Sequence, residues 1–220
     1  MKLLFARNRK LSAAGFLKCC LALGLWMIPE AVVAAGTPAS SPSSESEAAV
    51  HSPVEKGANE WGWMSGGATG LPGGAMSRGL WMLDLRWGRV LTGVHGPGPL
   101  RGTLEYVLEV VPALVVRQST TVFGGGFNPL LLQYNFTVSR RIVPFIQAGA
   151  GTLLTDRTVP ASSSQFNFTP QGGFGVYLFR RPSSAFSVGV RYHHISNAGI
   201  RRRNPGLNSM YFYSGYSWWR

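Results

Sequence analysis

The chain has 220 residues with 21 basic and 9 acidic side chains, a formal net charge of +12, and only two cysteines, Cys19 and Cys20. So basic a chain usually suggests nucleic acid as a partner, but the export signal described next argues against nucleic-acid binding. Both cysteines lie inside that signal. The exported chain would therefore contain no disulfide, no thiolate metal ligand and no thiol nucleophile.

The first 35 residues have the features of a secretory signal peptide. A basic segment is followed by an apolar stretch over 19–28 and by a small-residue cleavage site at Val33-Ala34-Ala35. The apolar stretch is too short to span a bilayer. Residues 36–58 are rich in Ser, Pro, Ala and Glu without apolar periodicity, which predicts a disordered leader.

Residues 59–220 are predicted to form one domain of eight strands. Turn signals separate strand-like runs near 59–68, 78–90, 101–115, 124–138, 142–154, 165–179, 185–196 and 208–219. Short turns near 139–141 and 180–184 alternate with longer loops such as 197–207, as in outer-membrane barrels. The fold class predicted is all-β, an eight-stranded antiparallel transmembrane β-barrel. A secreted soluble barrel or sandwich is the alternative.

The run that ends at Ser196 shows the alternation most clearly. Stepping back from Ser196 in twos gives a mostly apolar face, formed by His194, Tyr192, Val190, Val188 and Phe186. In a membrane barrel such a face points into lipid and the other parity fills the lumen. The same reasoning places Glu105 and Glu109 in the lumen, where we expect them to pair with Arg86 or Arg191.

The segment Arg191-Tyr192-His193-His194-Ile195-Ser196-Asn197-Ala198-Gly199, followed by Asn204-Pro205-Gly206, resembles the outer-membrane lipid A 3-O-deacylases of the PagL type. The resemblance is dense over about 188–219 and architectural before that. It implies an outer-membrane esterase that acts on lipid A or lipopolysaccharide. The implied roles are base for His194, nucleophile for Ser196, and oxyanion stabilisation by Asn197 and the backbone N–H of Gly199.

The chain departs from that family at the acidic member of the triad, because Asn208 occupies the position fourteen residues after His194. If the last two runs form a hairpin in which residue 194 pairs with residue 208, both side chains lie on the same face, roughly 5 Å apart at Cβ. An amide oxygen accepts a hydrogen bond from imidazole but supplies no negative charge to stabilise imidazolium.

A run of three arginines, Arg201, Arg202 and Arg203, falls in the loop beside the expected site. Arginine binds phosphate bidentately, so this run either binds the phosphates of lipid A or is a solvated loop. Serine–histidine hydrolysis requires no cofactor or metal. Two alternative functions remain open, a catalytically impaired or non-enzymatic barrel and an esterase that acts on phospholipid. A homodimer also remains open.

Overall fold

The computed structural model describes residues 54–75 and 79–220. The predicted signal peptide over 1–35 lies outside the described residues, as does the predicted leader up to residue 53. Of the leader's last five residues, Val54 is buried and the Gly57 N–H donates to the Val90 carbonyl at 2.9 Å. No helix in the described part of the chain has the length and apolar character needed to cross a membrane.

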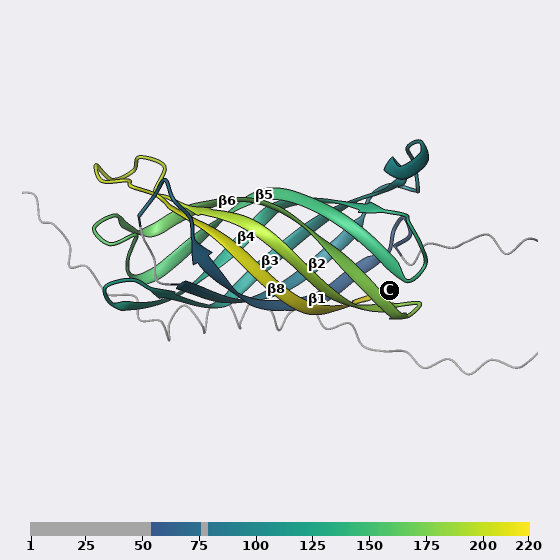
Figure 1. The fold of residues 1–220 in the computed structure, drawn as a ribbon, viewed down its shortest axis with the longest axis horizontal. Helices are drawn as coiled ribbons and strands as arrows, with labels where there is room; N and C mark the ends of the chain where they lie inside the picture. The colour runs from purple at the N-terminus through teal and green to yellow at the C-terminus, as the bar shows by residue number, and fades with distance from the viewer. Residues whose placement is uncertain (1–53, 76–78) are drawn as a thin grey trace, which may run out of the picture.

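Eight antiparallel strands form a closed barrel, in which the last strand pairs with the first (Figure 1). The strands are β1 Asn59–Gly70, β2 Gly79–Val90, β3 Gly102–Arg117, β4 Thr121–Phe136, β5 Ile142–Val159, β6 Ser164–Arg181, β7 Ser184–Ile195 and β8 Leu207–Trp219, with one 3-10 turn, η2 Gly98–Leu100. The predicted fold class and strand number are confirmed. The expected bounds of β5 and β6 are too short, because these strands still pair at Val159 and Ser164, beyond a register shift.

The barrel has two different ends. The outer bounds of β1 and β8 lie at one end with the connections over 91–101, 137–141 and 182–183, and we call this the terminal end. The opposite end, here the loop end, carries residues 71–75 after β1 and the connections over 118–120, 160–163 and 196–206. The expected alternation of short and long connections is incomplete. Residues 91–101 are long at the terminal end, and 118–120 are short at the loop end.

Each strand alternates between a buried lumen face and an exposed apolar face. In β7, Phe186 and Val188 are 50% and 45% exposed. Ser187, which lies between them, and Arg191, which has the same parity as Ser187, are each 1% exposed. Large apolar side chains continue this exposed surface on neighbouring strands, among them Phe174 and Phe212. The apolar exterior is the surface that a membrane barrel presents to lipid, so the predicted parity of β7 is confirmed.

The lumen is filled by a network of charged and amide side chains. The Arg191 guanidinium donates to both carboxylate oxygens of Glu109, at 2.9 and 3.0 Å, and also to the side-chain oxygens of Gln171 and Gln147. Arg86 lies 3.3 Å from a Glu60 carboxylate oxygen and 4.0 Å from a Glu109 oxygen. The predicted pairing of Glu109 with lumen arginines is confirmed.

Glu105 differs from the expectation. It lies in the lumen, but its carboxylate accepts hydrogen bonds from the amides of Asn135 at 2.8 Å and Gln133 at 3.3 Å. Among the described residues it forms no ion pair within 4.0 Å, because the Arg86 guanidinium contacts Glu60 and Gln133 instead. Amide donors therefore contact one oxygen of Glu105, whereas Arg191 donates to both oxygens of Glu109.

These two carboxylates provide a matched test of the network. Glu109→Gln should destabilise the barrel by about 3–5 kcal/mol, because it leaves the buried Arg191 without its charge partner. Glu105→Gln should cost about 1–3 kcal/mol, the range for a perturbed buried hydrogen bond. Urea unfolding of the refolded barrel, followed by tryptophan fluorescence, would measure both. A smaller loss for Glu109→Gln than for Glu105→Gln would contradict the ion-pair account.

Candidate active site

His194 and Asn208 face each other across the last hairpin. The β7–β8 register pairs His194 directly with Asn208, as predicted from the fourteen-residue spacing. The imidazole Nδ1 and the amide Oδ1 of Asn208 are 2.6 Å apart. Both side chains are half-buried at the loop end of the exposed apolar face, so they lie at the outer wall of the barrel and not in its lumen.

This contact fixes the tautomer of His194. An amide oxygen only accepts hydrogen bonds, so Nδ1 must carry the proton and donate it to Asn208. In the neutral imidazole with this tautomer, the other ring nitrogen, Nε2, carries the lone pair. A histidine in this form has the protonation state required of a general base.

Tyr192 is a third member of the cluster, and the sequence pattern alone did not indicate a role for it. Its hydroxyl donates to the same Asn208 Oδ1 at 2.8 Å. The amide oxygen therefore accepts one bond from imidazole and one from phenol, which uses both of its lone pairs. Tyr192 lies two residues before His194 on the same face, so a hydroxyl at this apolar position was the signal available in the sequence.

The wall behind the imidazole is formed by glycine and backbone. Gly206 has φ +66°, and a Cβ placed on it would lie 2.9 Å from the Cε1 atom of His194. The β1–β2 loop covers the same edge, because the N–H of Leu71 donates to the Asn208 carbonyl and the N–H of Ala75 to the Gly206 carbonyl. A side chain at Gly206 would displace the imidazole, so this position requires glycine.

Ser196 follows β7 and forms a two-way backbone bridge with Phe168 of β6. It shares the face of His194, two residues along an extended chain, so the two Cα atoms are about 7 Å apart. Among the described residues the Ser196 hydroxyl makes no hydrogen bond. Catalytic hydrogen bonds are often long or unformed before substrate binds.

Asn197 and Gly199 hold the turn after Ser196. The buried Asn197 amide donates to Ser163 Oγ at 3.0 Å and to the Arg203 carbonyl at 2.9 Å, and its oxygen accepts the Gly199 N–H at 2.9 Å. The turn places Ala198 at φ +49°, a conformation that costs a non-glycine residue on the order of 1 kcal/mol or more. Both groups expected to stabilise an oxyanion are hydrogen-bonded in this conformation, to groups of the same loop and of the β5–β6 connection.

The three arginines of the loop are exposed. Arg203 lines an open hollow of about 510 Å³ together with Ala161 and Ser162 of the β5–β6 connection and Asn204-Pro205. Arg201 and Arg202 precede it in the same loop. The arginine run therefore lies at the loop end, within a few residues of Ser196 along the chain.

Comparison with known proteins agrees with this architecture. The family model for lipid A 3-O-deacylase (PagL) matches residues 72–217, about two thirds of the chain. A lipid A deacylase PagL from Bordetella bronchiseptica is 40% identical over 67 residues, which span 29% of this chain and 35% of that protein. The chain thus matches about a third of the length of this relative.

Among crystal structures, the outer-membrane enzyme PagL is 23% identical and superimposes with a TM-score of 0.54, over 71% of this chain and 97% of that one. The outer-membrane protein OprG from Pseudomonas aeruginosa is 15% identical with a TM-score of 0.44, over 77% and 99%. The fold is that of an outer-membrane barrel, and the chain is located in the outer membrane. With its family model matched over most of the barrel, the chain belongs to the lipid A 3-O-deacylase (PagL) family.

Proposed function

We propose that the protein hydrolyses the ester-linked acyl chain at the 3-O position of lipid A, with Ser196 as nucleophile and His194 as general base. The observation that carries this proposal is the 2.6 Å contact between His194 Nδ1 and Asn208 Oδ1. It leaves Nε2 unprotonated on the face that Ser196 shares. Membership of the deacylase family supports the choice of substrate.

The proposed reaction has two stages. Ser196 Oγ attacks the ester carbonyl while Nε2 of His194 accepts the hydroxyl proton, and the tetrahedral intermediate collapses as Nε2 returns the proton to the leaving sugar oxygen. Water, deprotonated by the same nitrogen, then cleaves the acyl-serine and releases the fatty acid. Asn208 holds the ring through Nδ1 in both stages, and Tyr192 orients Asn208.

The loop after Ser196 is the proposed location of the oxyanion donors. In this proposal the Gly199 N–H exchanges its bond to Asn197 Oδ1 for one to the developing oxyanion, and the Asn197 amide holds or supplements it. Arg201, Arg202 and Arg203 contact the phosphates of lipid A. The acyl chain lies along the exposed apolar face below the site, where Val188 and Phe212 are 45% and 56% exposed.

A catalytically impaired barrel is the second candidate, and the amide at position 208 is the observation that favours it. In a serine protease triad, the corresponding change from acid to amide lowers turnover about 10⁴-fold. Mass spectrometry of lipid A from cells with and without the protein separates the two candidates. Loss of one acyl chain supports the enzyme, and unchanged lipid A supports the impaired barrel.

Ser196→Ala and His194→Ala should each lower lipid A deacylation by about 10³-fold or more. The first removes the proposed nucleophile, and the second removes the group that accepts its proton. Ser183→Ala and His95→Ala, at the terminal end, are matched controls and should retain full activity. The barrels should remain folded, as judged by heat-modifiable migration. Undiminished activity in either site variant would refute the assignment.

Substitutions at Asn208 should move the rate in opposite directions. Asn208→Asp has the same reach to Nδ1 and adds a charge that stabilises imidazolium, so kcat should rise about tenfold or more. Asn208→Ala loses the hydrogen bond that fixes the tautomer and should lower kcat about tenfold. Deacylation of purified lipid A in detergent measures both. Equal rates for wild type and both variants would show that residue 208 is not part of the site.

Tyr192→Phe should lower kcat about threefold to tenfold without changing KM or stability, because it removes one neutral hydrogen bond from Asn208 Oδ1. Tyr216→Phe, on the same exterior surface and with no hydroxyl hydrogen bond among the described residues, is the matched control. In the Asn208→Ala background the Tyr192→Phe effect should vanish. A full effect in that background would show that Tyr192 acts independently of Asn208.

A further inference from the structure

Exposed positive charge is concentrated at the terminal end, far from His194 along the strands. Outside the lumen, the described chain carries one acidic residue there, Glu55, against eight basic ones, Lys56, Arg89, Arg101, Arg140, Arg141, Arg180, Arg181 and Arg220. Most carboxylates of the described chain, among them Glu60 and Glu109, are buried in the lumen instead. They therefore do little to neutralise the basic surface.

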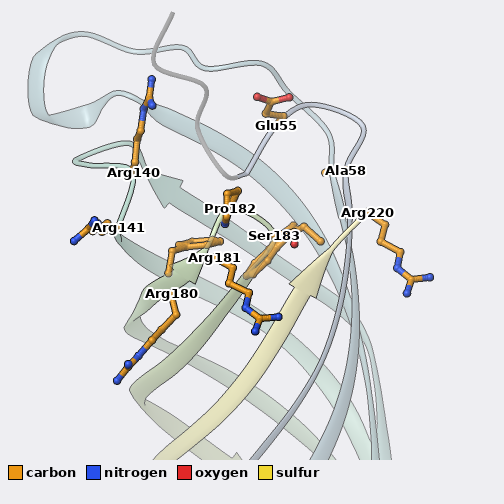
Figure 2. Close-up of a pocket in the computed structure, with 11 residues that line it drawn as sticks. Glu55, Ala58, Arg140, Arg141, Arg180, Arg181, Pro182, Ser183 and Arg220 are labelled. Atoms are coloured by element: carbon orange, nitrogen blue, oxygen red, sulfur yellow. The ribbon is translucent and has the colours of Figure 1, made fainter. Parts of the chain in front are cut away.

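Five of these arginines form an arginine collar at the β4–β5 turn, the β6–β7 turn and the end of β8, namely Arg140, Arg141, Arg180, Arg181 and Arg220. They border a recess of about 560 Å³. Figure 2 shows their side chains spreading outward around the barrel end, not converging on one point. Within the described residues, the side chains of Arg141, Arg180 and Arg181 have no carboxylate within ion-pair distance.

The collar lies where the apolar exterior ends. Leu178 is exposed on the outer face of β6, and Arg180 follows on the same parity, one step nearer the terminal end. Ile142, which pairs with Leu178, is likewise exposed and directly follows Arg141. Long arginine side chains at such a boundary place their stems along apolar surface and their charges at the level of lipid headgroups.

The recess itself has an aromatic base. Phe179 and Trp219 line it, and their rings pack 4.9 Å apart. The buried indole N–H of Trp219 has no acceptor among the described residues.

We propose that the arginine collar binds the headgroup phosphates of anionic phospholipids in the periplasmic leaflet of the outer membrane. Guanidinium groups bind phosphate oxygens bidentately, and basic clusters next to membrane-spanning segments recruit anionic lipids. An outward-spreading ring suits lipids that surround the barrel better than one compact soluble anion. The short turns beside the collar are of the kind that faces the periplasm in outer-membrane barrels.

The test uses the refolded exported chain in detergent, with native mass spectrometry to count bound lipid during titration with phosphatidylglycerol or phosphatidylcholine. Wild type should prefer phosphatidylglycerol, and the triple variant Arg141→Gln/Arg180→Gln/Arg181→Gln should bind it on the order of a hundredfold more weakly, about fivefold for each arginine. The control, Arg117→Gln/Arg157→Gln, removes exposed arginine charge at the loop end, away from the collar and from the proposed site. It should leave phosphatidylglycerol binding unchanged.

Equal lipid binding by wild type and the collar variant would overturn the proposal, as would equal losses in the collar variant and the control variant. Displacement of lipid by inorganic phosphate at matched ionic strength would show that the recess takes free phosphate, which overturns the lipid assignment. Lipid binding that appears only after deletion of residues 36–53 would identify the leader as occupant and also overturn it. The inference is independent of the proposed function, since lipid A deacylation is measured separately.

Discussion

The ion pair between Arg191 and Glu109 is the interaction on which the arrangement of the site depends. A strand has only two faces, so once Arg191 is committed to the lumen, His193 and Ile195 face inward, and Tyr192 and His194 face outward. Moving β7 by one residue would expose Arg191 to lipid and bury Phe186 and Val188 in a polar lumen. The lumen network thus specifies the register that places a histidine on the outer wall.

Register also determines which residue meets that histidine. Antiparallel pairing sets Arg191 opposite Tyr211 and therefore His194 opposite Asn208, and the 2.6 Å contact follows from directly opposed side chains. The β1–β2 loop, hydrogen-bonded to the start of β8, restrains the same edge from the other side. The geometry of the site is therefore a consequence of barrel closure, with β1 and β7 on either side of β8.

The sequence was sufficient to predict the barrel, which side chains of β7 point outward, and the contact between residues 194 and 208. Each of these depends on alternation or on counting along a hairpin. It was insufficient for features that depend on loop conformation. The Asn197 amide donates to Ser163 and Arg203 and accepts the Gly199 N–H, and no periodic pattern places these groups together. Gly206 is similar, since its need for glycine arises from the imidazole ring above it. Glu105 was expected to pair with arginine, and local competition for Arg86 decided otherwise.

The amide at position 208 has a physical rationale in where the site lies. A carboxylate on the outer wall would face hydrocarbon on one side, and the desolvation of its charge would cost folding free energy. An amide avoids that penalty and still fixes the tautomer, at the expense of charge stabilisation in the transition state. Tyr192 offsets part of this loss, because a second donor on Oδ1 orients the amide and polarises it. In the proposed mechanism, Asn208 and Tyr192 together form a neutral substitute for an acid, beside a histidine on the outer wall of the barrel.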